Sequence, residues 1–166
     1  MREVLRRLGP LCAVFGSAGA AVALLVALLM VASVVMRALW DQPIAGDVEL
    51  TQMGIALGIS LCLPYAQMQR ANIIVDFFTQ KASPAVQGVL DALGQLFLAV
   101  VYALLAWRTS AGALSVREAG ETTMIISLPM WWAYASLAPG LALAALIAVL
   151  QGWLGLTSRH TQEVQA

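Results

Sequence analysis

The sequence predicts an all-α integral membrane protein with four transmembrane helices, forming a single membrane domain over residues 1–166. Two features of the composition favour this fold class: 61% of the 166 residues are hydrophobic and only 11% are charged. An average soluble domain carries about 25% charged residues, so this chain has too few to cover a water-facing surface. The third observation is the position of the charges, which leaves long uncharged runs between Arg7 and Arg37, Glu49 and Arg70, Asp91 and Arg108, and Glu121 and Arg159.

Each uncharged run predicts one helix, because a membrane-spanning helix needs about 20 mostly apolar residues. We expect helices at about 11–36, 50–69, 86–107 and 130–152, followed by a polar tail at 157–166. The first run follows an Arg6-Arg7 pair, as in a signal peptide, but it exceeds the usual apolar core of about 7–15 residues, so we expect a retained helix. The third run is short, so its helix should begin before Asp91, near Pro84. Pro129 suits the first turn of the fourth helix, where its missing N–H needs no partner.

The connection from Arg70 to Pro84 has an amphipathic pattern. Its apolar residues are interleaved with Asn72, Asp76 and Lys81. Two interpretations remain open: an interfacial amphipathic helix between the second and third transmembrane helices, lying in the headgroup plane, or an extension of the second helix.

The distribution of basic residues predicts the orientation, because cytoplasmic segments carry an excess of Lys and Arg. If both termini are cytoplasmic, six basic residues lie inside and three lie outside: Arg2, Arg6, Arg7, Arg70, Lys81 and Arg159 against Arg37, Arg108 and Arg117. We therefore expect a multi-pass protein with a cytoplasmic N-terminus and a cytoplasmic C-terminus.

The sequence offers almost no chemistry, which argues against an enzyme and against a bound cofactor or metal. His160 is the only histidine, and Cys12 and Cys62 lie singly in apolar runs, so a haem ligand pair and a reactive dithiol are both lacking. No charge lies near the middle of a predicted helix, which disfavours a self-sufficient ion-coupled carrier. The basic residues form no extended patch for nucleic acid. The chain is better suited to be a partner of another protein in the bilayer.

Candidate interface residues lie in the second helix and in the two loops expected outside. Gly54 and Gly58 form a G-x-x-x-G motif that lets helices approach closely, either within this chain or against a second protein. Apolar helices without internal polar anchors should also make the chain poorly behaved alone. The charged candidates are placed at helix ends, as caps or as partner contacts, or, for Arg117 and Glu118, in the middle of a loop; they are Arg37, Asp47, Glu49, Arg117, Glu118 and Glu121.

Four segments together resemble the small membrane subunit (DctQ type) of the tripartite ATP-independent periplasmic transporters, the TRAP family. The resemblance covers about residues 10–152, and one departure is Asn72, where many relatives carry His. The segments are Arg37-Ala38-Leu39-Trp40, Gly46-Asp47-Val48-Glu49-Leu50, Ala71-Asn72-Ile73-Ile74-Val75-Asp76, and Gly120-Glu121-Thr122-Thr123 followed by Leu128-Pro129-Met130-Trp131-Trp132-Ala133-Tyr134.

The resemblance implies an accessory role in the bacterial inner membrane. In such systems a soluble periplasmic substrate-binding protein captures an organic acid, and a large membrane subunit imports it with a sodium gradient. The small subunit would form a heterodimer with the large subunit, support its scaffold and offer part of the docking surface for the binding protein. Sodium coupling would then reside in the large subunit. The alternative is an unrelated four-helix membrane assembly or scaffold protein without a transport role.

Overall fold

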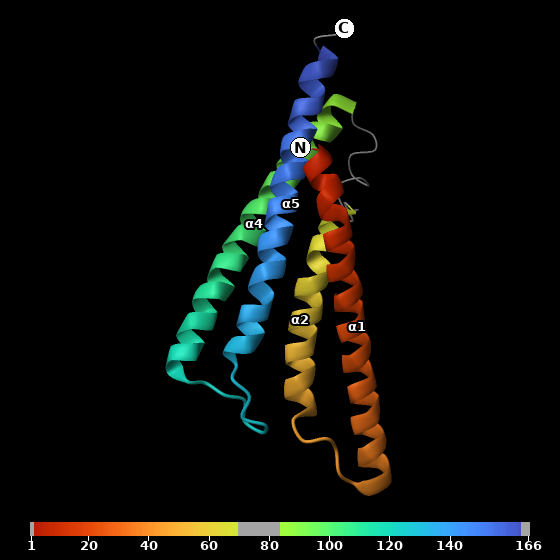
Figure 1. Cartoon of the computed structure of the whole chain (residues 1–166), viewed down its shortest axis with the longest axis vertical. Helices are drawn as coiled ribbons and strands as arrows, with labels where there is room; N and C mark the ends of the chain where they lie inside the picture. The colour runs from red at the N-terminus through yellow and green to blue at the C-terminus, as the bar shows by residue number, and fades with distance from the viewer. Residues whose placement is uncertain (1, 70–83, 164–166) are drawn as a thin grey trace.

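The computed structural model describes residues 2–69 and 84–163, and this part of the chain folds into four helices (Figure 1). They are α1 (Arg2–Trp40), α2 (Asp47–Met68), α4 (Pro84–Ala119) and α5 (Trp131–Glu163). Each contains a stretch long and apolar enough to cross a membrane. The predicted all-α class and the four spans are therefore confirmed. The amphipathic segment predicted between the second and third spans falls mainly on residues 70–83, outside the described residues.

The helices run further than the sequence predicted at most of their ends. Arg37 and Arg108 were expected to end the first and third helices, but both lie inside α1 and α4. A charge marks where hydrocarbon gives way to headgroups, but it does not stop a helix, since the backbone hydrogen bonds continue unchanged. At about 1.5 Å per residue, the 36 residues of α4 measure about 54 Å, well beyond the hydrocarbon thickness of about 30 Å.

Backbone reversals, rather than charges, end α1 and α4. At the end of α1, Asp41 adopts a left-handed conformation (φ 56°) and its N–H bonds to the carbonyl of Arg37 at 3.0 Å. At the end of α4, Gly120 has φ 66°, and the N–H groups of Gly120 and Glu121 bond to the carbonyls of Arg117 and Val116. This paired arrangement is a Schellman motif, which satisfies the last carbonyls of a helix.

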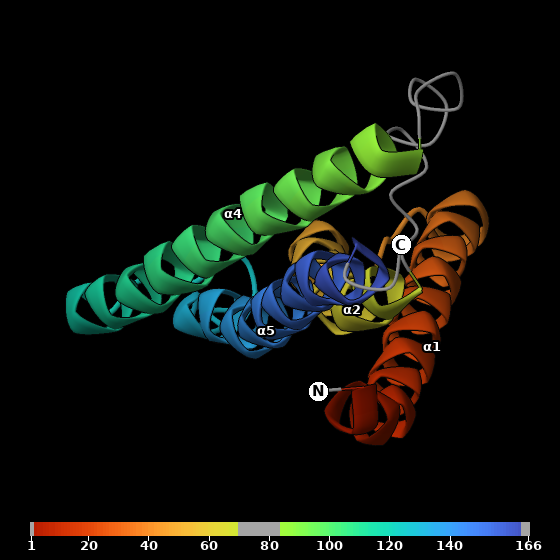
Figure 2. The ribbon, with the colours of Figure 1, turned by 90° about the horizontal axis from the view of Figure 1, so that it is seen from above.

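The four helices form a row rather than a closed bundle. Within the described residues, α4 packs against α5, α5 against α2, and α2 against α1, while α4 makes no close backbone approach to α1 or α2. Figure 1 shows the pairs α1–α2 and α4–α5 separating toward the end that carries the connecting loops, and Figure 2 shows α1 and α4 on opposite sides of the row. The outer helices α1 and α4 consequently carry many exposed apolar side chains.

Glycines set the closest contacts within the row. A Cβ added at Gly54 would lie 2.3 Å from the Val26 side chain, and one at Gly58 would meet the backbone of Gly19 at 3.6 Å. The G-x-x-x-G motif therefore faces α1 within this chain. The α2–α5 crossing is tighter still, because a Cβ at Gly140 would lie 2.0 Å from the carbonyl oxygen of Ser60.

Buried polar side chains hold three of the helices together, contrary to the expectation of helices without internal polar anchors. Gln67 and Gln151 are only 2% and 4% exposed. The Gln67 amide donates to the side-chain oxygens of Gln95 on α4 and Gln151 on α5, and the Gln151 amide donates to the carbonyls of Gln67 and Met68 at the end of α2. An unpaired polar group in hydrocarbon costs several kcal/mol, so these bonds favour one register of α2, α4 and α5.

Candidate functional site

Most of the predicted interface residues lie where the helices end along their axes, on the side that carries the loop 41–46 and the segment 121–130. We call this the hairpin end. It comprises the loop 41–46, the segment 121–130 and the adjoining ends of the helices (Figure 1). Gly54 and Gly58 lie apart from it, where α2 packs against α1. The predicted residues at the hairpin end are Arg37, Asp47, Glu49, Arg117, Glu118 and Glu121.

Residues 121–130 form a hairpin-shaped loop closed by an isolated bridge, where the sequence predicted only a connection. Thr122 and Pro129 form an antiparallel bridge, the Thr123 N–H donates to the Leu128 carbonyl at 2.9 Å, and the Met130 N–H donates to the Glu121 carbonyl at 3.1 Å. The Thr123 hydroxyl also accepts the Leu128 N–H at 3.0 Å. These bonds give the connection a fixed shape.

Glu49, in the first turn of α2, fastens this hairpin to the other half of the protein. Its carboxylate accepts the backbone N–H of Ile125 at 2.8 Å and that of Ile126 at 3.2 Å. The Ile126 side chain lies over the buried Gly46, where an added Cβ would come within 2.6 Å of it. Gly46 has φ 74° as well, so a residue with a side chain would be strained there and would clash with the hairpin.

Asp47 closes the other loop of the hairpin end. Its carboxylate accepts a hydrogen bond from the buried Ser33 hydroxyl of α1 and one from the Val48 N–H at 2.8 Å. The Ser33 oxygen in turn accepts the Ile44 N–H at 3.2 Å. Asp47 thus fixes the α1–α2 turn, as expected of a carboxylate near a helix N-terminus.

Arg37 does not pair with the acidic residues of α2. Among the described residues, the ion pairs join Glu3 to Arg6 and Arg7 at the opposite end of α1. Arg37 itself is exposed in the last turn of α1, where a cation interacts favourably with the helix dipole.

Arg117 and Glu118 are not in the middle of a loop, so that expectation was wrong. Both lie in the last turn of α4, which continues to Ala119 because nothing interrupts the helix before Gly120. The Arg117 guanidinium lies 5.3 Å from the ring centre of Trp131, a cation–π distance. The Trp131 ring meets Trp132 edge-on at 6.1 Å. Arg117 therefore has a local role in joining the ends of α4 and α5, while Glu118 and Glu121 are exposed.

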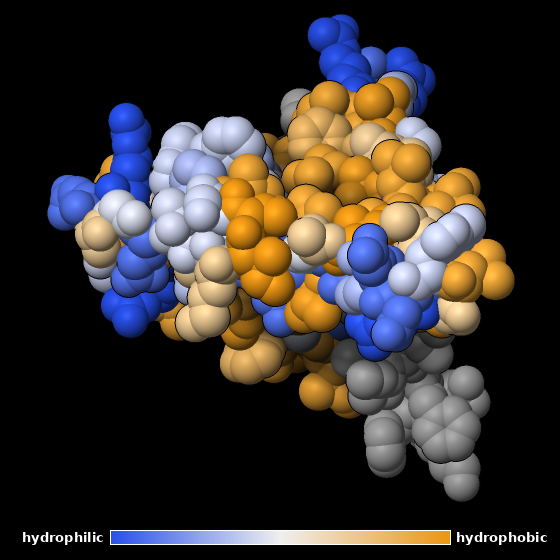
Figure 3. Space-filling model, turned by 90° about the horizontal axis from the view of Figure 1, so that it is seen from below, coloured by the Kyte–Doolittle hydropathy of each residue, from blue (hydrophilic) through white to orange (hydrophobic). Residues whose placement is uncertain are grey.

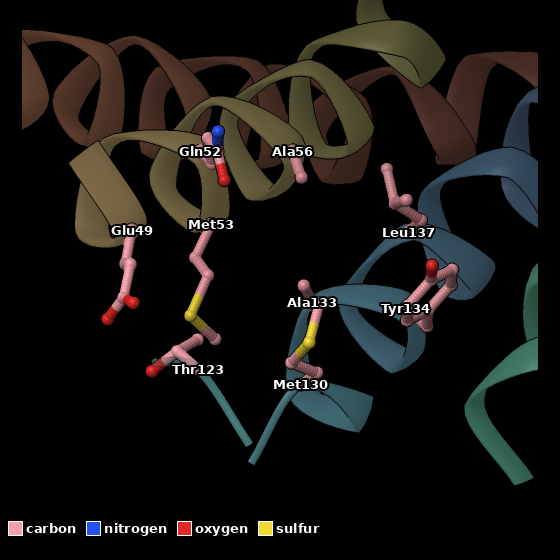
Figure 4. A pocket seen from close by; sticks show the side chains of 9 residues that line it. All are labelled: Glu49, Gln52, Met53, Ala56, Thr123, Met130, Ala133, Tyr134 and Leu137. Atoms are coloured by element: carbon pink, nitrogen blue, oxygen red, sulfur yellow. The ribbon is translucent and has the colours of Figure 1, made fainter. Parts of the chain in front are cut away.

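A cleft of about 240 Å³ lies between α2 and α5 beside the hairpin (Figure 4). Its ionisable side chains are Glu49 and Tyr134, and the Glu49 carboxylate is already bonded to the hairpin. The lining residues are Glu49, Gln52, Met53 and Ala56 from α2 and Thr123, Met130, Ala133, Tyr134 and Leu137 from the hairpin and α5.

The hairpin end presents a mixed surface to its surroundings. Figure 3 shows hydrophilic residues over the end of α4 on the left and near the α1–α2 turn at the lower right, with hydrophobic residues between them. In the part of the chain that the structure describes, no group of three or more His, Cys, Asp or Glu side chains is placed to hold a metal ion. The mixed polar and apolar surface is suited to contact with other molecules.

Sequence reasoning missed two features of this end, the hairpin and the role of Glu49 as its anchor. The sequence does contain one indication of the hairpin: Gly120 and Pro129, both residues that favour turns, lie on either side of the segment between the two helices. Nothing in the sequence pairs Glu49 with residues 125 and 126.

Comparison with known proteins agrees with the architecture. A family model described as "Tripartite ATP-independent periplasmic transporters, DctQ component" matches residues 26–158. No curated protein and no solved structure gives a significant match. The match includes α2, α4 and the entire hairpin end, and the four spans agree with a multi-pass inner-membrane component. The chain therefore belongs to the DctQ family, the small permease component of the tripartite ATP-independent periplasmic transporters.

Proposed function

We propose that this chain is the accessory scaffold subunit that holds the large membrane subunit of a TRAP transporter during sodium-coupled, binding-protein-dependent uptake of an organic acid. The family match carries the proposal. The row of helices supports it, because a row leaves broad apolar faces that a second membrane protein can cover, whereas a closed bundle would turn them inward.

The internal contacts suit a frame that stays rigid while its partner moves. The glutamine cluster joins the last turn of α2 to α4 and α5. The Glu49–hairpin contact joins the first turn of α2 to the α4–α5 connection. Two separated points of attachment restrict rocking of α4–α5 against α2.

Orientation is part of the proposal. The basic residues favour cytoplasmic termini, which places the hairpin end in the periplasm, on the side of the soluble binding protein. Sodium and substrate would bind in the large subunit, because no charged side chain lies near the middle of a described span of this chain.

Co-expression with the large membrane subunit tests the proposal. With an affinity tag on this chain, we expect the large subunit to co-elute in equal amount, while a tagged four-helix membrane protein of another family should retain none. In proteoliposomes supplied with binding protein, an organic acid and an inward sodium gradient, uptake should require both membrane subunits. Full uptake by the large subunit alone would contradict the scaffold role.

A further inference from the structure

The tip of the hairpin exposes two apolar side chains. Met124 is 98% exposed and Ile125 is 62% exposed. Neighbouring Ile126, in contrast, is turned inward over Gly46. The tip therefore divides its apolar residues between one that anchors the hairpin and two that project from it.

This projection is held in shape before any partner arrives. The Thr123–Leu128 bonds fix the two arms, and the Glu49 carboxylate binds the N–H groups of Ile125 and Ile126 directly beside Met124. A rigid loop loses little conformational entropy on binding, so more of its contact energy is available for affinity.

Hydrocarbon tails do not cover the tip. An irregular backbone with a charged carboxylate among its amides is not tolerated against lipid, because its polar groups would lose their hydrogen bonds to water. The tip therefore lies at the membrane boundary or beyond it. Figure 3 shows hydrophilic patches on two sides of this end with hydrophobic residues between them, and protein interfaces commonly combine an apolar centre with polar surroundings.

We propose that Met124 and Ile125 form the apolar contact on which the soluble substrate-binding protein docks, by inserting into an apolar depression on its surface. This inference rests on the proposed function and on the periplasmic orientation of the hairpin end. The tip lies at the hairpin end, where the helices end along their axes (Figure 1). A soluble protein approaching along these axes reaches it directly, whereas the large subunit would pack against the sides of the helices within the membrane. Methionine suits a contact that forms and breaks repeatedly, because its flexible side chain adapts to the partner surface.

Two measurements on the complete transporter test this docking contact. In the first, uptake by Met124→Ser is measured over a range of binding-protein concentrations. We expect about a tenfold rise in the concentration needed for half-maximal uptake, which corresponds to about 1.4 kcal/mol. The matched control is Leu114→Ser, which removes an exposed apolar side chain from α4 and should leave the concentration unchanged.

In the second measurement, a photo-crosslinking amino acid replaces Met124 in the assembled complex. We expect an adduct with labelled binding protein, and this adduct should disappear when unlabelled binding protein is added in excess. An adduct with the large subunit alone, or an unchanged concentration dependence for Met124→Ser, overturns the inference but leaves the scaffold role intact. Failure of the wild-type chain to assemble with the large subunit contradicts the proposed function itself.

Discussion

Replacing Gly140 with alanine should separate α2 from α5. The new Cβ would lie 2.0 Å from the Ser60 carbonyl oxygen and 2.2 Å from its hydroxyl oxygen, whereas real Cβ atoms essentially never approach within 3.0 Å. The helices must therefore move apart by about 1 Å, and overpacking of this kind costs about 1–3 kcal/mol. The Ser60 hydroxyl also bonds to the carbonyls of Ser136 and Leu137 at 2.9 and 3.1 Å, and each such bond in a membrane contributes about 0.6 kcal/mol.

The helix propensity of alanine offsets at most about 1 kcal/mol of this loss, so we expect a net destabilisation of about 1–3 kcal/mol. Gly112→Ala is the matched control in α4. Its Cβ would lie 3.5 Å from the Tyr134 ring, an ordinary contact, and the same propensity should leave stability unchanged or slightly higher.

The native thiols provide the assay. Cys12 is 0% exposed, so a thiol-reactive fluorophore added during heating in detergent reports the loss of helix packing. Gly140→Ala should react at a lower temperature than the wild type, and Gly112→Ala should not. If the two variants melt together, the close crossing of α2 and α5 at Gly140 does not exist, and the argument fails.

The other predictions use the same purified complex or intact cells. Reporter fusions after residues 45, 120 and 160 should read outside, outside and inside, and an outward C-terminus would reverse the orientation. Gln151→Leu should lower the melting temperature because the buried Gln67 amide loses one of its acceptors. An unchanged melting temperature would show that the glutamine cluster does not stabilise the fold. Glu49→Gln should speed hydrogen exchange at the Ile125 and Ile126 amides, since one acceptor oxygen is lost. Exchange equal to that of the wild type would show that the hairpin keeps its shape without Glu49. Arg117→Glu should raise the binding-protein concentration needed for half-maximal uptake, while Arg117→Lys should not, and neither should affect assembly. If the two variants need the same concentration, the role of Arg117 is limited to its contact with Trp131.

Helix number followed from the sequence because the bilayer imposes one simple requirement on it. A span must be long and apolar, so the uncharged run between Arg7 and Arg37 predicted α1 without knowledge of any contact. Helix ends were harder to predict, because a charge such as Arg108 shows only where the hydrocarbon ends. The residue that ends α4 is Gly120, whose left-handed backbone closes the Schellman motif.

The candidate site divides in the same way. Asp47 and Glu49 were identified as residues of a helix start, and both lie in the first turn of α2. Their partners come from elsewhere in the fold: Ser33 for Asp47, and Ile125 and Ile126 for Glu49. A capping pattern is local in the sequence, but a carboxylate that bonds across the molecule leaves no pattern in its own segment.

The sequence by itself determined the fold class, the four spans and the family, because each depends on composition and on local order along the chain. Only the tertiary structure decided that the helices form a row, that Gly54 and Gly58 face α1, and that Gln67, Gln95 and Gln151 meet. Every face of a lipid-exposed helix can be apolar, so hydrophobic periodicity does not reveal which face meets a neighbour. Helix pairing is instead determined by small residues that allow close approach and by the few polar side chains that must find partners away from water.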